Sequence, residues 1–462
     1  MNRPSKGPQR ARPQRRKPLD PARRAAFDVL RAVSDRDAYA NLLLPAILSE
    51  RGIEGRDAAF ATELTYGACR TRGLLDAVIG HAAGRPPERI DPVLLDLLRL
   101  GTYQLLRTRV EAHAAVSTTV EQAGIEFDSA RAGFVNGVLR TVASRDEKSW
   151  TAELAPSAAT DPVGHAAFIH AHPRWIAQAF TDALGARARE LDPLLACDNE
   201  RPAVHLAARP TALTAADLAA QTGGTVGRYS PYAVYLPGGD PGRLTAVTEG
   251  AAQVQDEGSQ LVARALTLAD VDGPDTGRWL DLCAGPGGKA ALLAAIGAAS
   301  AAHVTAVEPG DRRADLVEAN ARGLGVDVHR VDGRESGLAP GFDRVLVDAP
   351  CTGLGALRRR PEARWRRQPA DVPGLAKLQR ELLAAAIRLT RSGGVVLYAT
   401  CSPHIAETLG VVADALRRHP VTAVDTRPLF EPADDLGDGP YVQLWPHRHG
   451  TDAMFAAALR VQ

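Results

Sequence analysis

The stretch from Trp279 to Lys289, which reads WLDLCAGPGGK, constrains the fold of this chain more than any other feature. An apolar strand pattern ends near Asp281, a turn rich in glycine follows, and an Ala/Leu-rich helix begins after the turn. Such a turn places bare backbone N–H groups and the positive end of a helix dipole beside a ligand. Its glycines let the ligand lie against the main chain because they carry no Cβ atom. The stretch therefore predicts a site for a nucleotide-like ligand at the end of a strand.

Two nucleotide-binding motifs have this general form, and the residues separate them. A P-loop requires a Gly five residues before its Gly-Lys pair and a Ser or Thr after it. Those positions hold Cys283 and Ala290, so a P-loop is excluded. Two interpretations remain: a Rossmann-type cofactor turn, or an ordinary glycine turn without a ligand. The cofactor turn would consist of Cys283, Ala284, Gly285, Pro286, Gly287, Gly288 and Lys289.

From Trp279 onward, strand patterns alternate with helix patterns. The strand candidates are residues 303–307, 326–331, 344–347, 395–399 and a last one at 454–461, and the helix candidates are residues 312–323, 372–390 and 405–418. This alternation predicts an α/β Rossmann-like fold with a mostly parallel, doubly wound sheet, which we assign to residues 253–462. We interpret the uncharged, alanine-rich residues 290–307 as a buried helix and a strand, not as a membrane span.

Upstream of this domain the pattern divides into further parts. Residues 19–150 show helical spacing of apolar side chains throughout, which predicts an all-α bundle. Residues 156–173 have the composition of a looser linker. Residues 165–252 predict a small α+β domain; its helix candidates are residues 175–184 and 215–222, and its strand candidates are residues 203–207 and 233–236. Residues 1–18 are basic and rich in proline, so we expect a disordered arm that either contacts phosphates or solubilises the chain.

Composition narrows the class of protein. The net charge is +1, so no overall field indicates a nucleic-acid partner, and any such signal must be local. The five cysteines are widely spaced and form neither a disulfide framework nor a CxxC metal pair. The N-terminus lacks the apolar segment of a signal peptide. We therefore expect a soluble, cytoplasmic protein without a metal site.

Two acidic residues follow strand candidates of the predicted sheet. Glu308 follows the strand after the cofactor turn, where a carboxylate suits the ribose hydroxyls of a nucleoside-containing cofactor. Asp332 follows the next strand, where it could reach the adenine end. Either residue could instead cap a helix or face solvent.

Two neighbouring strands each deliver a cysteine to the same edge of the sheet. The fourth strand ends in Asp348 and is followed by Cys351, and the fifth is followed by Cys401. A lone cysteine is usually a small buried hydrophobe, but two at equivalent strand ends favour chemistry. A thiolate is a strong nucleophile when a helix N-terminus or a cation lowers its pKa, and both cysteines precede predicted helices.

An arginine-rich segment follows Cys351. It contains Arg358, Arg359, Arg360, Arg364, Trp365, Arg366 and Arg367. Guanidinium groups beside an indole favour a surface that contacts phosphates and stacks on bases. The alternative is a solvated arginine face.

These motifs resemble those of a known family. DLCAGPGGK, DAPCTGLGALRRRPEARWRR and YATCS are similar to motifs of the Sun/Fmu family of RNA cytosine-C5 methyltransferases. Residues 22–143, with ARRAAFDVL, FATELTYGACR and FVNGVLRTV, resemble the helical RNA-binding domain of the antitermination factor NusB. The pairing is similar to the bacterial enzymes that methylate small-subunit ribosomal RNA.

The resemblance implies a cofactor and residue roles. It implies S-adenosylmethionine in the 283–289 turn, with Glu308, Asp332 and Asp348 also at the cofactor and base sites. It further implies that Cys401 is the nucleophile that adds to C6 of cytosine. Asp348 would then bond the base edge, and Cys351 would assist product release. Because the base must be unstacked, single-stranded or loop RNA is the expected substrate.

The sequence departs from the family pattern at two positions. Gly285 replaces the usual Ala, which we expect to be harmless, and Thr408 replaces an Asn in the segment after Cys401 that keeps Glu407. The second change puts in doubt the hydrogen bonding behind the nucleophile.

Other functions remain open at this point. They are a transfer RNA cytosine methyltransferase, a non-catalytic RNA-binding assembly factor and a small-molecule methyltransferase. A binding factor needs neither cysteine, and a small-molecule enzyme needs no arginine–tryptophan surface. The sequence does not determine the oligomeric state, and a monomer is slightly favoured.

Overall fold

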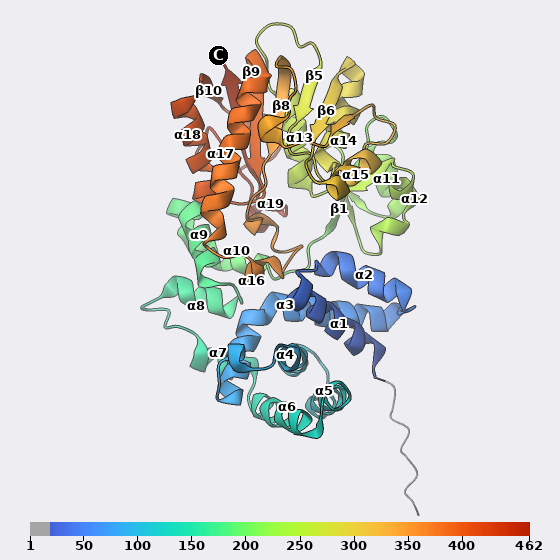
Figure 1. Ribbon diagram of the computed structural model, residues 1–462, viewed down its shortest axis with the longest axis vertical. Coiled ribbons are helices and arrows are strands. Elements are labelled where there is room, and N and C mark those ends of the chain that lie inside the picture. Colours follow the sequence, from blue (N-terminus) through green and yellow to red (C-terminus); the bar gives the residue numbers. More distant parts are fainter. Residues whose placement is uncertain (1–18) are drawn as a thin grey trace, which may run out of the picture. The chain divides into compact units, whose positions relative to one another are not determined.

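The computed structural model describes residues 19–462, so the arm expected at residues 1–18 lies outside it. The chain divides into two compact units, one ending at Leu154 and one spanning Ala155–Gln462 (Figure 1). We describe each unit by itself.

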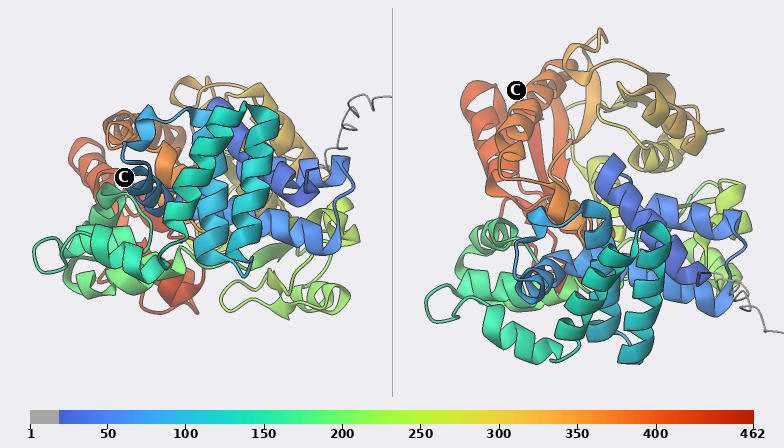
Figure 2. Two further views of the ribbon diagram at one scale, coloured as in Figure 1. Left: turned by 90° about the horizontal axis from the view of Figure 1, so that it is seen from below. Right: turned by 60° about the horizontal axis from the view of Figure 1, so that its bottom comes forward.

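The first unit is entirely helical in its described part, as predicted. Its α-helices are α1 (Pro21–Arg36), α2 (Ala40–Glu50), α3 (Gly55–Ala83), α4 (Pro92–Arg107), α5 (Ala112–Glu126), α6 (Ser129–Val142) and α7 (Glu147–Leu154). The start of α4 follows from its sequence, because the Asp91 carboxylate accepts hydrogen bonds from the first free N–H groups and Pro92 occupies the first helical position. Helices α5 and α6 lie side by side (Figure 2). Helices α3 and α4 approach closely at Gly67, where a Cβ atom would lie 2.0 Å from the Tyr103 ring.

The second unit begins with three helices and a small antiparallel sheet. The helices are α8 (Pro162–Ile169), α9 (Arg174–Leu184) and α10 (Leu191–Cys197). The sheet has the order β2 (Thr225–Val226), β3 (Ala233–Leu236), β1 (Val204–Ala208) and β4 (Ala252–Val254), with α11 (Ala215–Thr222) and α12 (Thr245–Thr248) beside it. The expectation of a linker over residues 156–173 is wrong at α8. There the Asp161 carboxylate caps the helix by accepting from Gly164 N at 2.9 Å, and Ala166 and Ala167 are buried.

The large sheet that follows carries the α/β domain. Its strand order is β10 (Val421–Val424), β12 (Phe455–Val461), β9 (Thr390–Thr400), β8 (Phe342–Asp348), β5 (Arg278–Asp281), β6 (His303–Val307) and β7 (Asp327–His329), with β11 (Val442–Gln443) on β12. Strands β5 to β9 are parallel to their neighbours in this set, whereas β12 is antiparallel to β9. The mostly parallel sheet is therefore confirmed, with an antiparallel strand inserted beside β9.

Helices cover both faces of this sheet (Figure 1). They are α13 (Glu257–Leu268), α14 (Gly288–Gly297) and α15 (Asp311–Asn320), then α17 (Asp371–Leu389) and α18 (Leu409–Arg418). Along β9, Leu397 packs in the core cluster of α13 and α14, whereas Val396 and Tyr398 pack in the cluster of α17 and α18. This alternation is the two-residue period of a strand buried on both faces.

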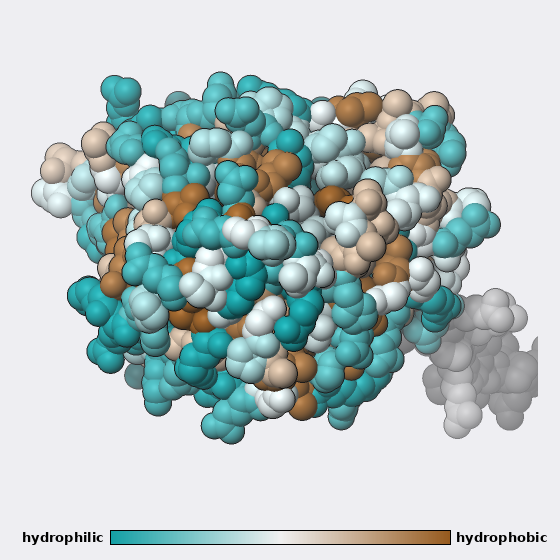
Figure 3. All heavy atoms as spheres, turned by 90° about the horizontal axis from the view of Figure 1, so that it is seen from above, coloured by the Kyte–Doolittle hydropathy of each residue, from teal (hydrophilic) through white to brown (hydrophobic). Residues whose placement is uncertain are grey.

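The expected helix over residues 405–418 has a different start. Residues Ile405–Glu407 form a 3-10 turn, and α18 begins only at Leu409. Thr408 between them has φ −117° and ψ −99°, which is not helical. No helix among residues 19–462 is long and apolar enough to cross a membrane. The surface in Figure 3 is mostly hydrophilic, with scattered hydrophobic residues of the kind that ordinary protein surfaces carry.

Candidate active site

The turn between β5 and α14 has the expected form. Gly287 has φ +107°, and a Cβ atom there would lie 2.7 Å from Val317 Cα, so only glycine fits. Ala284 N donates to Val307 O at 2.9 Å, which ties the turn to the end of β6. The first helical residues, Gly288 and Lys289, follow directly. The turn thus presents helix N–H groups at the carboxyl end of the sheet.

Glu308 lies beside this turn and is only 2% exposed. Its Oε1 atom accepts from Gly310 N at 3.0 Å, and its Oε2 atom lies 3.1 Å from Arg313 Nη2. Arg313 also donates to Gly285 O at 2.9 Å. A Cβ atom on Gly285 would lie 2.3 Å from Glu308 Oε2 and 2.7 Å from Arg313 Nε. An alanine methyl group at this position would therefore require the side chains of the ion pair to shift.

Asp332 lies on the segment after β7. Its carboxylate pairs with Arg334 at 2.7 Å, and that hydrogen bond lowers the pKa of Asp332. The next residue packs against the turn, since a Cβ atom on Gly333 would lie 2.9 Å from Leu282 O. Asp332 therefore lies near the cofactor turn, with Arg334 bound to it.

Lys289 connects the turn to β8. Its Nζ atom lies 2.7 Å from Asp348 Oδ2, at the end of that strand. Burial alone would lower the pKa of Lys289, but the Asp348 charge and hydrogen bond outweigh it and raise that pKa.

Asp281, at the end of β5, is a buried acid that the sequence did not single out for a role. Burial, and then the Asp348 charge, raise its pKa to about 7, although Lys289 acts in the opposite direction. The Oδ1 atom accepts from Cys283 N at 3.3 Å. The buried Oδ2 atom has no hydrogen-bond partner among residues 19–462. Burial also raises the pKa of the Cys283 thiol well above its usual value.

The two strand-end cysteines meet. Strands β8 and β9 are parallel neighbours with Asp348 opposite Ala399, so the segments that follow them run side by side. The Cys351 and Cys401 Sγ atoms are 3.5 Å apart. The hydrogen bond with Cys401, and then burial, raise the pKa of Cys351 well above its usual value. Because the 405–407 segment is a 3-10 turn, α18 begins only at Leu409, and the helix N-terminus expected soon after Cys401 lies further along the chain.

A buried network lies directly behind the thiols. Thr352 and Ser402, the residues after the two cysteines, both donate hydrogen bonds to the Glu407 carboxylate. Thr408, which stands where the family has Asn, donates to His404 O at 3.1 Å. The sequence pointed to Glu407 only as a retained residue and did not reveal this role.

The arginine-rich segment does not form one RNA-facing surface. The expectation is wrong for Arg358 and Arg364, which are 6% and 0% exposed. Arg358 donates to Gly450 O; Arg364 donates to Ala171 O, Asp198 O and Asn199 Oδ1. These arginines join segments of the second unit and are not available to RNA.

The other members of the segment differ in exposure. The expectation is also wrong for Arg359 as a free RNA ligand, because its guanidinium lies between Asp256 (2.7 Å) and Asp452 (3.0 Å). Arg367 is partly exposed and donates to Thr352 O at 3.1 Å. Arg360 is exposed, and Trp365 and Arg366 are partly exposed. These four keep exposed surface, whereas the partly exposed Arg359 is held by two carboxylates.

Sequence reasoning missed two glutamines beside the turn. Gln253 Nε2 donates to Gly288 O at 2.7 Å and to Gln255 Oε1 at 2.8 Å. Gln253 Oε1 is buried and without a hydrogen-bond partner in the described part of the chain. The available signal was a polar run, QVQDEGSQ, at a strand-to-helix junction, where buried amides are unusual.

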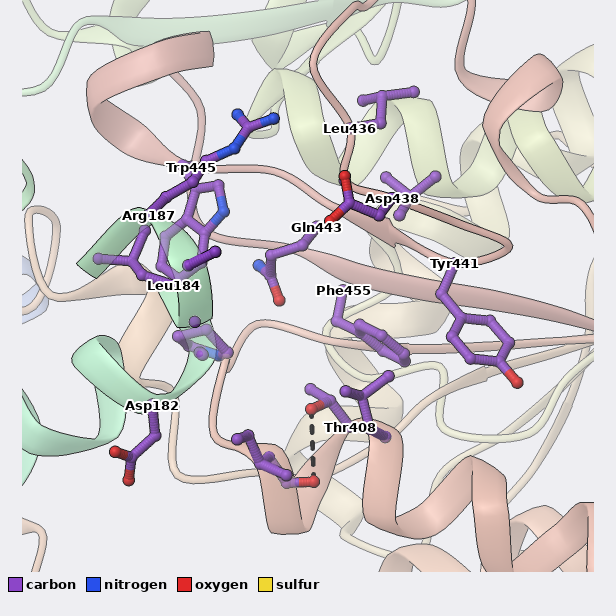
Figure 4. A pocket seen from close by; sticks show the side chains of 18 of the residues that line it. Asp182, Leu184, Arg187, Thr408, Leu436, Asp438, Tyr441, Gln443, Trp445 and Phe455 are labelled. Carbon is purple, nitrogen blue, oxygen red and sulfur yellow. Dashed lines mark hydrogen bonds between the residues drawn. The ribbon is translucent and has the colours of Figure 1, made fainter. Parts of the chain in front are cut away.

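A separate pocket is lined by residues of the segment that follows Cys401 and by residues from other parts of the second unit (Figure 4). Its wall includes Arg187, Ile405, Tyr441, Trp445 and Phe455. None of the site residues expected from the sequence lines it. Among residues 19–462, no group of three or more His, Cys, Asp or Glu side chains is arranged to hold a metal ion.

Comparison with known proteins adds to this geometry. Residues 266–460 match the family model described as 16S rRNA methyltransferase RsmB/F, and residues 20–144 match the NusB family model. A Mycobacterium tuberculosis protein, named as a methyltransferase, is 79% identical over 452 residues, which cover 98% of this chain and 99% of that protein. Ribosomal RNA small subunit methyltransferase B of Erwinia tasmaniensis is 32% identical over 455 residues, which cover 94% of this chain and 97% of that protein.

Solved structures share the fold. The structure of PH0851 aligns with a TM-score of 0.80 and 22% identity, covering 96% of this chain and 99% of its own. The structure of NSun6 from Pyrococcus horikoshii with SFG aligns with a TM-score of 0.55 and 18% identity, covering 63% and 99%. At these identities the likeness shows a common fold.

Proposed function

This chain belongs to the RsmB/F family of 16S rRNA methyltransferases, and from that premise we propose that it transfers a methyl group from S-adenosylmethionine to C5 of a cytosine in small-subunit ribosomal RNA. The observation that carries the proposal is the pair of thiols 3.5 Å apart. They follow β8 and β9, and the Lys289–Asp348 ion pair joins the end of β8 to the turn after β5. Methylation at an oxygen or an exocyclic nitrogen needs no such pair, because those atoms are already nucleophilic.

The chemistry of cytosine explains the first thiol. Its C5 carbon is a poor nucleophile, so a second nucleophile must first add to C6. The Cys401 thiolate forms a bond to C6, and the electron pair of the C5–C6 double bond moves into the ring toward N3. The Asp348 side chain meets the N3/N4 edge and stabilises the charge that develops there. C5 then has the electron density to take a methyl group.

The second thiol belongs to product release. After C5 is methylated, its proton must leave to a base, the C5–C6 double bond re-forms, and the bond between C6 and Cys401 Sγ breaks. We assign Cys351 to assist this release because its Sγ atom lies against Cys401 Sγ. The hydrogen bond with Cys401, and then burial, raise the pKa of Cys351 well above its usual value, so this thiol keeps its proton.

The residues around the turn fit S-adenosylmethionine, which supplies an electrophilic methyl group when bound. Glu308 uses one lone pair on each oxygen for Gly310 and Arg313, so each oxygen keeps another for a ribose hydroxyl. The unpartnered Asp281 Oδ2 and Gln253 Oε1 atoms are buried acceptors that suit N–H donors. Asp332, Asp348 and the turn residues Cys283, Ala284, Gly285, Pro286, Gly287, Gly288 and Lys289 complete the proposed cofactor site.

The RNA would be held by several parts of the chain. The NusB-like unit, the small α+β domain and the exposed part of the 360–367 segment are candidates for backbone contacts. The target base must leave its stack to reach Cys401, so a single-stranded or loop region is the expected substrate. A transfer RNA, a binding factor without catalysis and a small-molecule substrate are the outcomes that the test must separate.

The test uses tritiated S-adenosylmethionine, small-subunit RNA and transfer RNA. It compares wild type, Cys401→Ala, Cys351→Ala and the control Cys197→Ala. We expect transfer to small-subunit RNA, its loss in Cys401→Ala, a protein–RNA adduct that survives denaturation in Cys351→Ala, and no change in the control. An adduct in Cys401→Ala instead would reverse the two roles. Absence of transfer to any RNA would favour the binding factor.

A further inference from the structure

Glu407 is a buried acid that the steps above do not use. It lies six residues after Cys401, at the end of the 3-10 turn, and is 0% exposed. A buried carboxylate is costly unless hydrogen bonds satisfy its oxygens, so its partners show what it holds.

Four donors converge on this carboxylate. Thr352 N donates to Oε1 at 2.8 Å, and Gln379 Nε2 donates to Oε1 at 3.0 Å. The Ser402 hydroxyl donates to Oε2 at 2.7 Å, and the Thr352 hydroxyl also donates to Oε2. An ionised carboxylate has about four acceptor positions, and all of them are used here.

The partners come from both segments that carry a thiol. Thr352 directly follows Cys351, and Ser402 directly follows Cys401. Gln379, on α17, also donates to Pro350 O at 2.8 Å, so it secures the residue before Cys351 as well. A separate backbone bond, from Gly355 N to Cys401 O at 2.8 Å, keeps the two segments adjacent but does not act on the residues next to both thiols.

We propose that Glu407 is a positioning residue that sets the distance between the Cys351 and Cys401 thiols. One carboxylate bonds the neighbour of each cysteine, so it fixes both segments to a common point. Tyr398 OH donates to Glu407 O at 2.6 Å and anchors that point to β9. This inference rests on the proposed function for its activity readout, whereas its thiol readout does not depend on that function.

Two substitutions separate charge from shape. Glu407→Gln keeps one oxygen for Thr352 N and Gln379, and its NH2 group can donate to hydroxyls that rotate to accept. Glu407→Ala removes all four hydrogen bonds that the carboxylate accepts. We expect kcat to fall about 10-fold in Glu407→Gln and about 100-fold in Glu407→Ala, because a small misplacement of reacting groups has effects of this size. The affinity for S-adenosylmethionine, measured by calorimetry, should stay the same, and the exposed Glu249→Gln is the matched control.

A thiol probe tests the geometry without RNA or cofactor. Phenylarsine oxide bonds two adjacent thiols through its arsenic atom, and its oxygen leaves as water with the two thiol protons. We expect wild type to retain this adduct against a monothiol competitor, and Cys351→Ala to lose it. In Glu407→Ala retention should fall about tenfold, because the second thiol no longer has a high effective concentration. Ser402→Ala removes one of the bonds to the Glu407 carboxylate, together with the contact between the Ser402 and Thr352 hydroxyls, and its retention should lie between wild type and Glu407→Ala.

Two results would overturn the inference. One is unchanged adduct retention in a folded Glu407→Ala protein. The other is a loss of activity that appears entirely as weaker cofactor binding. If Glu407→Ala does not fold, Glu407→Gln and Ser402→Ala decide by the same two measurements. If wild type methylates no RNA, the proposed function fails, but retention of the phenylarsine oxide adduct still tests whether Glu407 positions the two thiols.

Discussion

Lys289 Nζ lies 2.7 Å from Asp348 Oδ2, so the lysine at the start of α14 is bonded to the carboxylate at the end of β8. The two residues are 59 positions apart in sequence. They meet because β5 and β8 are parallel neighbours whose carboxyl ends share one edge of the sheet. A single contact thus joins the proposed cofactor turn to the proposed base-binding carboxylate.

The first prediction concerns this ion pair. Lys289→Met should lower kcat about 100-fold, because Asp348 loses the cation that orients it beside the buried Asp281. Asp348→Asn should have a similar effect. Since the two act as one unit, the double variant should be no worse than the poorer single one. A double-mutant cycle on methyl transfer measures this, and additive losses would mean independent roles.

The second prediction is a pH dependence of stability. The folded-state pKa of Asp281 is raised to about 7, above the ordinary value near 4 in the unfolded chain. The folded state therefore holds a proton that the unfolded chain releases, so the contribution of Asp281 is full below about pH 4 and is lost as the pH rises to about 7. Asp281→Asn cannot titrate, so its stability relative to wild type should improve by about 3 kcal/mol between pH 5 and pH 8. Urea unfolding at both pH values tests this, and a constant difference would refute it.

The fold could be predicted from the sequence where local pattern decided it. The β6 strand has the predicted bounds, His303–Val307, because a run of apolar residues between turns can only be a buried strand in this alternating order. The start of α18 could not be placed correctly, although its end at Arg418 was, because Glu407 is bound inside a network of distant residues and Thr408 leaves the helical region. Such long-range bonds leave no mark on the local pattern.

The candidate site, like the fold, could be predicted from the sequence only in part. The positions of Glu308, Cys351 and Cys401 follow from parallel strands that end at one edge. The contacts of Arg313 and Gln253 depend on how side chains pack across that edge, which the local pattern does not reveal. Charge density likewise does not reveal whether an arginine faces water or a carbonyl group.

The third prediction separates the buried arginine from the exposed one. Arg364→Met should lower the free energy of unfolding by about 3 kcal/mol, because two buried carbonyls and Asn199 Oδ1 lose their donor. Arg360→Ala should change stability much less, weaken RNA binding, and reduce the salt dependence of the binding constant. Thermal unfolding and filter binding at several salt concentrations compare the two. If both variants fold and weaken RNA binding equally, the assignment of Arg364 to the interior is wrong and Arg364 belongs to the RNA-binding surface.

The fourth prediction concerns Gly285. In Gly285→Ala the new methyl group meets Glu308 Oε2 at 2.3 Å and Arg313 Nε at 2.7 Å, so the ion pair must shift. Because Glu308 is the proposed ribose ligand, we expect the affinity for S-adenosylmethionine to fall about 10-fold, which is about 1.4 kcal/mol. Arg313→Ala frees the space that the methyl group needs, so the double variant should bind more tightly than Gly285→Ala alone. Calorimetry on the three variants measures this. A double variant weaker than both single ones would show that Arg313 itself holds the cofactor and that the crowding at Gly285 is incidental.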